Sequence, residues 1–308
     1  MEARSTAAVT AIGAIAPLVW GTTYVVTTEL LPPHHPMTAA VLRAVPAGLL
    51  LIAITRAWPR AWGRLIVLSA LNIGLFFPLL FVAAYRLPGG LAAVVGAAQP
   101  FVVAVAAGVL LRQRTPVRQL VWAALAVGGV ATAMLTGEVT LDAIGVLAAT
   151  GGTVAMALGI TLTRSWGATA GLSGLASTGW QLLLGGLMIL PLVPVIDHGP
   201  FVLDRAAVLG YAWLSLIGAA LAYSVWFHAA RRLPATSTSM LAVLSPVAAA
   251  SLGWAVLDQN FTTIQVVGFV VALTASVLGQ ARPDVSGEGR ACNPDLPARA
   301  MGSTHGRG

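Results

Sequence analysis

Ten apolar stretches divide this 308-residue chain, and each is long enough to cross a lipid bilayer. About 20 residues of α-helix span the ~30 Å hydrocarbon core of a membrane. Within that core every backbone polar group must be bonded inside the chain, which leaves the α-helix for segments of this length. The sequence therefore predicts an all-α membrane protein with ten transmembrane helices, at about 9–30, 37–55, 65–85, 89–111, 117–136, 143–163, 176–196, 207–228, 235–257 and 262–281.

The composition supports lipid as the surrounding medium. Charged residues make up 9% of the chain and hydrophobic residues 57%, whereas a soluble domain has about 25% charged residues. The net charge of +7 raises the question of a nucleic-acid partner, but the basic residues stand in short connections, as in cytoplasmic loops. We expect a lipid bilayer and no nucleic acid as partner. The single cysteine, Cys292, lies in a polar tail and excludes a disulfide framework.

Arginine positions predict the orientation. With the N-terminus inside, eleven arginines lie beside the cytoplasmic ends of the stretches and two, Arg86 and Arg205, beside the external ends. This excess is the positive-inside pattern. We expect both termini in the cytoplasm, with a cytoplasmic N-terminus over 1–8 and a disordered cytoplasmic tail over 282–308. The first apolar run continues past Pro17 to Val26, so we expect a retained span instead of a cleaved signal peptide.

An internal repeat organises the ten stretches. The segment "RLPGGLAAVVGAAQP" at 86–100 recurs 146 positions later as "RLPATSTSMLAVLSP" at 232–246. The repeating unit is five helices, 9–136 and 143–281, joined by an external linker at 137–142. Because five is odd, the second unit enters the membrane upside down. Inverted repeats of this kind are typical of secondary transporters, in which two related halves alternate between outward-open and inward-open states.

Several segments carry a family resemblance. "PLVWGTTYVVTTELLP", "LRAVPAG" and "AAYRLPGGLAAVVGAAQPFVVAVAAGVLL", with the twofold repeat, resemble the EamA-type members of the drug/metabolite transporter superfamily. The resemblance covers about 9–281, and within it the segments "WGTTYVVTTELLPP" and "LRAVPAG" look most similar to the pigment-exporter-like branch. The resemblance implies ten helices, a central cavity and the export of small metabolites. The family usually ends its fourth and ninth helices with Gly-Glu, whereas this chain has Gln113 and Gln259; a coupling role of that glutamate would be lost here, and a helix-ending role would survive.

Two prolines in equivalent positions predict broken helices along the substrate pathway. Pro100 and Pro246 each remove a backbone donor and leave the carbonyl four residues earlier without its partner. Inside a membrane such carbonyls are tolerated where protein or a wet cavity satisfies them. A plain packing kink is the alternative. If the prolines line the pathway, the residues before them, Gln99 and Ser245, are polar lining groups.

Arg43 is the one arginine deep inside a predicted span, and a charge at that depth costs about 2.5–3.5 kcal/mol. A long guanidinium can extend toward Glu29 on the antiparallel neighbouring helix. The sequence leaves two interpretations open, a helix-pair ion bridge and a contact with substrate or a coupling proton. Glu29 is the one acidic residue within a span, at its outer end, so it is the coupling candidate for a proton gradient. The second repeat has Gln181 at the position of Arg43, and we expect Gln181 to lie along the substrate pathway.

Aromatic and amide side chains supply the remaining pathway candidates. Trp20 and Tyr24 share a helix face and can stack on a planar substrate. On the eighth stretch Tyr223 is a pathway candidate, while Trp226 and Phe227 lie near a predicted membrane surface and are expected to be interfacial. Asn72 is a polar candidate whose alternative role is hydrogen bonding between helices. The histidines lack carboxylate or cysteine neighbours at ligand spacing, so we expect no metal and no cofactor.

These observations predict a secondary exporter of a small metabolite that is planar, aromatic or amino-acid-like, acting as a monomer or a homodimer in the cytoplasmic membrane. An enzyme is not expected, because the chain lacks clustered acids, histidines or metal ligands at a membrane surface. The alternatives are a lipid-modifying membrane enzyme and a lipid or nucleotide-sugar translocase. A nucleotide-sugar translocase would need several basic residues in its cavity, and Arg43 is the one candidate.

Overall fold

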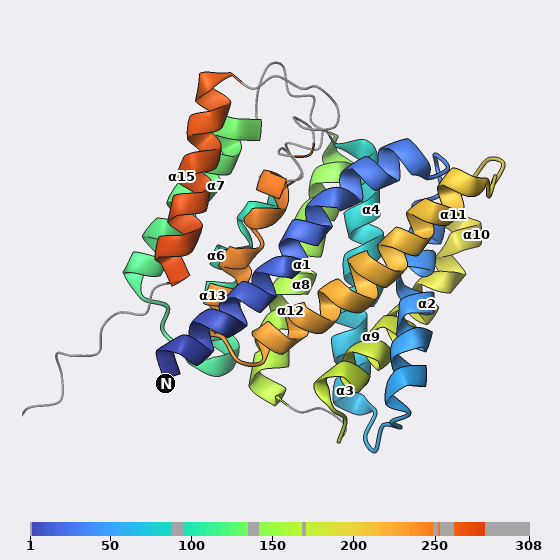
Figure 1. Ribbon diagram of the computed structural model, residues 1–308, viewed down its shortest axis with the longest axis horizontal. Coiled ribbons are helices and arrows are strands. Elements are labelled where there is room, and N and C mark those ends of the chain that lie inside the picture. Colours follow the sequence, from blue (N-terminus) through green and yellow to red (C-terminus); the bar gives the residue numbers. More distant parts are fainter. Residues whose placement is uncertain are drawn as a thin grey trace, which may run out of the picture.

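In a computed structural model, residues 2–87, 95–134, 142–167, 171–248, 252 and 262–280 are described. Every regular element in these ranges is a helix, so the predicted all-α class is confirmed (Figure 1). Six helices are long and apolar enough to cross a membrane, and four shorter apolar helices, Val95–Leu111, Val117–Ala133, Ala235–Ala248 and Thr263–Gly279, bring the described total to the ten expected. Gln259, most of the linker at 137–142 and the tail lie outside the described residues.

The first repeat holds spans one to five, numbered in chain order. They are α1 (Glu2–Leu30); α2 (Pro36–Thr55); α3, η1 and α4 (Gly63–Ser69, Ala70–Leu75, Phe76–Arg86); a short helical segment at 95–97 with α6 (Gln99–Leu111); and α7 (Val117–Met134).

The second repeat holds spans six to ten. They are α8 (Ala143–Trp166); α9, η2 and α10 (Gly174–Ile189, Leu190–Leu192, Val193–Ile196); α11, η3 and α12 (Arg205–Ala212, Trp213–Leu221, Ala222–Ala230); α13 (Ala235–Leu241) with a short helical segment at 244–248; and α15 (Thr263–Gln280). Pro191 and Pro194 account for the change from α9 through η2 to α10, since proline cannot donate to a continuing ladder.

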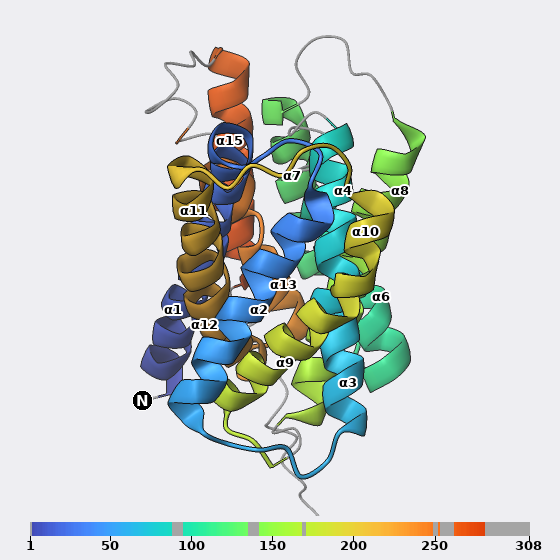
Figure 2. The ribbon, with the colours of Figure 1, turned by 90° about the vertical axis from the view of Figure 1, so that its right-hand side faces the viewer.

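Neighbouring helices are paired as an inverted repeat requires. Span one packs against span eight (α1 and α12), and span six packs against span three (α8 and α4). Exchanging the two repeats converts the first pair into the second. Equivalent spans also pair directly, α2 with α9 and α7 with α15, at opposite edges of the bundle (Figures 1 and 2).

The crossing of α2 and α9 shows the same exchange in detail. A Cβ on Gly48 would lie 2.5 Å from the Leu183 backbone nitrogen, and a Cβ on Gly186 would lie 2.6 Å from a Val45 methyl group. An offset of 138 residues converts Gly48 into Gly186 and Val45 into Leu183. The two helices therefore touch through a symmetric pair of contacts, and glycine is required because any side chain would separate the backbones.

Spans three and eight each contain a π-helical segment that the sequence did not predict. These are η1 (Ala70–Leu75) and η3 (Trp213–Leu221), in equivalent positions of the two repeats. A π-helical turn bonds each N–H one residue further back than an α-helical turn and is frequently found at functional sites. Side chains beyond each segment are therefore rotated relative to a continuous α-helix.

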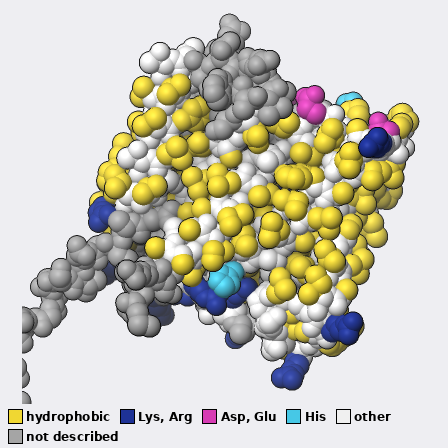
Figure 3. All heavy atoms as spheres, viewed as in Figure 1, with side chains coloured by type: hydrophobic (Ala, Val, Ile, Leu, Met, Phe, Trp, Pro, Cys, Tyr) yellow, Lys and Arg dark blue, Asp and Glu magenta, His cyan; other side chains and the backbone are white. Residues whose placement is uncertain are grey.

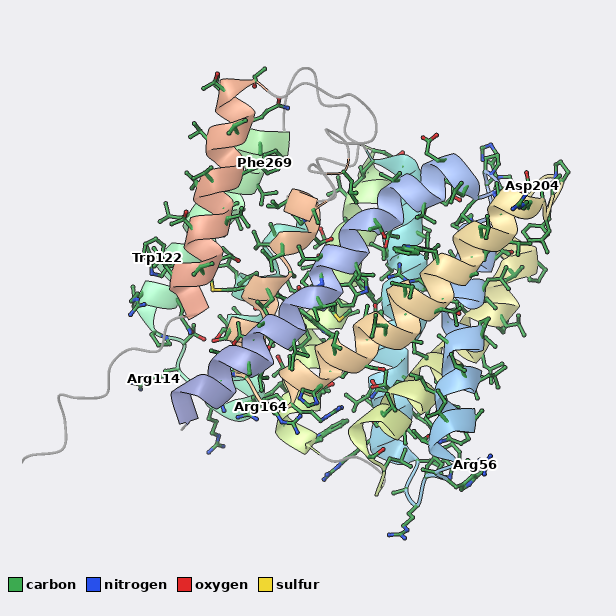
Figure 4. The ribbon with its side chains drawn as sticks, in the orientation of Figure 1. Arg56, Arg114, Trp122, Arg164, Asp204 and Phe269 are labelled. Atoms are coloured by element: carbon green, nitrogen blue, oxygen red, sulfur yellow. The ribbon has the colours of Figure 1, made fainter. Side chains whose placement is uncertain are left out.

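The two ends of the bundle differ in charge. Arg56, Arg114 and Arg164 lie at one end and Asp204 at the other, with an apolar band between (Figures 3 and 4). Carboxylates at the second end cap helices that begin there. Asp142 accepts from Gly145 N at 2.7 Å, Asp204 from Ala207 N at 2.8 Å, and Asp197 from Met37 N at 2.9 Å. Negative charge at a helix N-terminus is favourable, which gives these acids a structural role.

Candidate functional site

A cavity of about 160 Å³ lies between the two repeats. Spans one, two, three and four line it from the first repeat, and spans six, eight and nine from the second. Its polar side chains are Thr23, Thr27, Arg43, Gln99, Thr153 and Ser245. Its aromatic side chains are Trp20, Phe76, Phe81, Tyr223 and Trp226. Six of the residues predicted for the pathway or the charge pair, namely Trp20, Arg43, Gln99, Tyr223, Ser245 and Pro246, thus lie around one space.

One wall of the cavity is an aromatic cluster. The ring centroid of Trp20 lies 4.9 Å from that of Tyr223 and 5.1 Å from that of Trp226. Tyr223 also contacts Phe77 and Phe227, each at 5.5 Å. Tilted and edge-to-face arrangements at such distances are the favoured ones for aromatic pairs. The cluster is therefore tightly packed, and Trp20, Tyr223 and Trp226 present ring surface to the cavity.

The expected interfacial position of Trp226 and Phe227 is wrong. Both side chains are buried, at 1% and 0% exposure. Chain distance from the end of span eight placed them near the membrane surface. In the structure they point inward, beyond η3, against Trp20 and Tyr223.

Arg43 is buried, with 2% of its surface exposed, and its guanidinium reaches the cavity. Its Nη2 donates to the Gly218 carbonyl at 3.1 Å, and its Cζ lies 5.0 Å from the centroid of the Phe77 ring. Trp20 Nε1 donates to the same carbonyl at 3.0 Å. Gly218 belongs to the π-helical segment η3. One backbone oxygen of span eight thus orients both the cation and the indole.

Among the described side chains, Glu29 and Arg43 do not form a salt bridge with each other, and Glu29 is exposed at the end of α1. The physical reason is that the guanidinium turns inward to the Gly218 carbonyl and the Phe77 ring instead of extending outward. The predicted helix-pair ion bridge is therefore absent from this conformation, and the coupling role of Glu29 stays a prediction.

Both predicted helix breaks are present. Span four changes register at Ala98, where Phe101 N donates to Ala98 O at 3.0 Å, and α6 resumes at Gln99 beside the buried Pro100. Span nine has its turn at 242–243, before Pro246. The carbonyl of Ala242 is not left without a donor, as the sequence suggested, because Ser245 N bonds it at 3.0 Å through a tighter turn. Gln99, Ser245 and Pro246 line the cavity, and Pro100 packs behind it.

Asn72 and Gln181 lie away from the cavity in a buried network. Asn72 Nδ2 donates to Gln181 Oε1 at 2.9 Å and to Thr163 Oγ1 at 3.4 Å. Gln181 Nε2 donates in turn to Ser177 Oγ at 3.2 Å. The network joins η1 of the first repeat to α8 and α9 of the second. The side chain of Tyr24, the remaining pathway candidate, lies outside the described residues.

Sequence reasoning missed Thr27 and Thr153, which line the cavity with Thr23. A signal existed for Thr27, because Trp20, Thr23 and Thr27 are spaced three and four residues apart on one helix face. Within the described part of the chain, the hydroxyls of Thr23 and Thr27 and the Trp226 indole nitrogen have no hydrogen-bond partner. A buried polar group without a partner costs about 1–3 kcal/mol, so these three groups are free to bind a ligand.

His35 Nδ1 lies 3.9 Å from Asp197 Oδ2 of the second repeat, a carboxylate far from it in the chain. Spacing along the chain could not reveal this contact. Among the residues that the structure describes, no group of three or more His, Cys, Asp or Glu side chains is placed to hold a metal ion.

Several known proteins are similar to this chain in sequence or in fold. Protein PecM of Dickeya dadantii is 42% identical over 268 residues, 86% of this chain and 90% of its own. A probable terminal-alkyne amino-acid exporter of Streptantibioticus cattleyicolor is 28% identical, over 68% of this chain and 70% of its own. A solved protein crystal structure shares the fold with a TM-score of 0.75 at 17% identity, covering 88% of this chain and 96% of that one. The profile of the EamA-like transporter family matches residues 8–135 and 143–278. This multi-pass membrane protein, with its two inverted five-helix repeats around a central cavity, belongs to the EamA-like transporter family.

Proposed function

We propose that the protein is a secondary active exporter, in the cytoplasmic membrane, of a small planar metabolite that carries a carboxylate. The observation that carries this proposal is the pairing, in one cavity, of the Arg43 guanidinium with an aromatic wall formed by Trp20, Tyr223 and Trp226. A guanidinium binds a carboxylate through two parallel hydrogen bonds, and aromatic rings favour a planar group beside them.

The size and polar groups of the cavity support a substrate of this class. A cavity of about 150 Å³ accommodates a benzene ring, so a space of about 160 Å³ suits one ring with its substituents. The hydroxyls of Thr23 and Thr27 and the Trp226 N–H have no partner among the described residues. All three can donate hydrogen bonds, which suits a substrate rich in acceptor oxygens.

The same features weigh against the alternatives. A nucleotide sugar needs more room and more cationic side chains than Arg43 alone provides within the described lining. A lipid-modifying enzyme would need a catalytic group, and the described lining contains no His, Cys, Asp or Glu. The Streptantibioticus relative is named as a probable terminal-alkyne amino-acid exporter, and an amino acid is an amphipathic substrate with a carboxylate.

Alternating access is the mechanism that we propose. The exchange of the two repeats supplies two equivalent half-pathways. By the arginine distribution, the Asn72–Gln181–Thr163 network lies toward the cytoplasmic side of the cavity. Opening toward the cytoplasm would have to separate these three spans and break the network. Substrate would then reach the cavity from the side that the present arrangement closes.

The test is transport by Arg43 variants reconstituted in proteoliposomes, with single-ring aromatic carboxylates and their uncharged amides as substrates. Wild-type protein should prefer the carboxylates. Arg43→Gln should raise the half-saturation concentration for carboxylates about tenfold or more, because a charge-assisted hydrogen bond is worth about 1.5–3 kcal/mol. Arg43→Lys should restore part of the preference, since it keeps the charge but loses the two-pronged geometry.

Arg60→Gln is the matched control, because Arg60 is exposed in the connection after α2 and is not part of the cavity lining. It should transport as wild type does. Equal transport of carboxylates by wild type and Arg43→Gln would overturn the substrate assignment and leave Arg43 with a packing role.

A further inference from the structure

A second pocket, of about 400 Å³, lies at the arginine-rich end of the bundle and is separate from the central cavity. Three helices form it: α1 through Ile12, the beginning of α9 through Gly174 and Leu175, and the end of α12 through Ser224, Val225 and His228. Arg231 and Arg232, directly after α12, complete the lining. The family resemblance and the central cavity assign no role to this pocket.

Positive charge is concentrated at one side of the pocket. The Arg231 guanidinium lies against Gly174, where a Cβ would be 2.1 Å from Nη2. Gly174 opens α9, so this cation stands at the positive end of a 16-residue helix, an unfavourable position for a cation. Burial and the neighbouring Arg232 also lower the pKa of Arg231. Arg164 adds a third guanidinium, which donates to the Arg231 carbonyl.

The described residues supply no carboxylate to balance this charge. Arg164, Arg231 and Arg232 form no ion pair with any acidic residue in the described ranges, and the pocket lining contains none. The N-terminus of a helix together with several arginines is the arrangement that binds phosphate groups in proteins.

His228 supplies another donor. Arg232 Nη1 lies 2.8 Å from His228 Nδ1. A guanidinium can only donate, so Nδ1 must be the acceptor and the ring proton must be on Nε2. This leaves an N–H that can bind an acceptor in the pocket.

The other side of the pocket is apolar and faces lipid. Ile12 and Leu175 are 40% and 38% exposed, and Val225 lies beside them in the lining. Figure 3 shows a histidine with basic side chains around it at the edge of the apolar band. The pocket therefore combines a cationic end with an exposed apolar rim.

We propose that this pocket binds the phosphate of an anionic phospholipid, with Arg231, Arg232 and His228 contacting the headgroup and Ile12 and Leu175 contacting the first carbons of an acyl chain. A membrane-facing basic pocket between helices is a setting in which anionic headgroups are recognised. The apolar rim favours a lipid over free phosphate, which has no group to place there.

The experiment is native mass spectrometry of the full-length protein in detergent, with phosphatidylglycerol, phosphatidylethanolamine and inorganic phosphate as separate probes. Wild-type protein should retain phosphatidylglycerol in preference to phosphatidylethanolamine. The Arg231→Gln/Arg232→Gln variant should lose about tenfold in phosphatidylglycerol affinity, because it removes two charge-assisted contacts. Arg232→Gln alone, at an exposed position, should lose part of the affinity and guards against a folding defect in the double variant.

Arg60→Gln/Arg114→Gln is the matched control, since it removes the same charge from exposed positions at the same end of the bundle. It should bind phosphatidylglycerol as wild type does. If the control and the pocket variant lost the same affinity for phosphatidylglycerol, the loss would be caused by the lower net charge, and the proposal would be overturned. Stabilisation by inorganic phosphate that depends on Arg231, without retention of phosphatidylglycerol, would overturn the assignment to lipid.

Discussion

Arg43 combines deep burial with a full positive charge, and its contacts with Gly218 and Phe77 are strong enough to offset the cost of that position. Placing an arginine at mid-membrane costs about 2.5–3.5 kcal/mol on insertion scales. The hydrogen bond to Gly218 O contributes about 1.5–3 kcal/mol, and the contact with the Phe77 ring about 0.5–2 kcal/mol. These terms offset the insertion cost and leave the guanidinium at the edge of the cavity.

Glu29 is the residue at which proton coupling can be tested. We expect Glu29→Gln, assayed in vesicles with an imposed pH gradient, to lose pH-driven transport and to keep substrate exchange. The reason is that Glu29 is the one acidic residue within a predicted span, and proton coupling needs a titratable group that both sides can reach in turn.

A Glu29→Asp variant, which keeps the carboxyl group, is the control and should retain pH drive. Undiminished pH-driven transport by Glu29→Gln would eliminate this carboxyl as the proton carrier. It would leave His228 or a gradient other than protons as the remaining possibilities.

At the residue scale, the sequence predicted which residues line the cavity better than it predicted which side chains hydrogen-bond to each other. Trp20 and Gln99 were predicted to line the pathway and do line the cavity, because aromatic and amide side chains in an apolar span need a polar neighbour or a wet surface. Asn72 and Gln181 were candidates for the same space, with hydrogen bonding between helices as the alternative for Asn72, and the structure shows that alternative: they hydrogen-bond each other away from the cavity. Nothing in the spacing along the chain can show that two amides on different helices will meet.

At the scale of elements, the breaks in spans four and nine were predictable and the π-helical segments were not. Proline removes one donor at a known position, so a break near Pro100 and Pro246 follows from the covalent structure. A π-helical turn depends on packing, and η3 has no proline within its nine residues. The unrecognised η3 also explains the error at Trp226, because η3 rotates the side chains that follow it.

The paired breaks lead to a prediction for transport. Pro100→Ala and Pro246→Ala should each insert and fold but transport more slowly, by several-fold, because a restored helix ladder straightens spans that form the pathway. Initial rates in proteoliposomes measure the effect, and the amount of folded protein is measured by size-exclusion chromatography.

Pro191→Ala is the control for this prediction. It removes a proline from η2, at the end of span seven and outside the cavity lining, and should leave the rate unchanged. Wild-type rates in Pro100→Ala and Pro246→Ala, together with wild-type rates in Gln99→Ala and Ser245→Ala, would make spans four and nine packing elements.

For the whole molecule, the fold class and the inverted repeat were predictable because hydrophobic length and chain periodicity constrain a membrane protein strongly. Orientation in the bilayer is the part that needs a measurement. We expect reporter fusions after residues 60, 114 and 164 to report the cytoplasm, and fusions near 34, 139 and 200 to report the outside. The physical reason is the retention of arginine-rich connections on the cytoplasmic side.

An external signal at residue 114 would contradict this topology, because four spans that start from a cytoplasmic N-terminus must return the chain to the cytoplasm. The native mass spectra recorded for lipid binding also give the mass of the assembly. They therefore distinguish a monomer from a homodimer.

The crossing of α2 and α9 has a kinetic consequence under the proposed mechanism. Because each contact there is the image of the other, with Gly48 on Leu183 and Gly186 on Val45, the crossing lies on the axis that exchanges the two repeats. A point on a rotation axis stays in place when the halves trade arrangements. The same bulkier side chain at both Gly48 and Gly186, which keeps the two contacts equivalent, would therefore slow the inward and outward steps by the same factor, without favouring either facing state. A change away from the axis, at Trp226 for example, would instead alter the ratio of the two states.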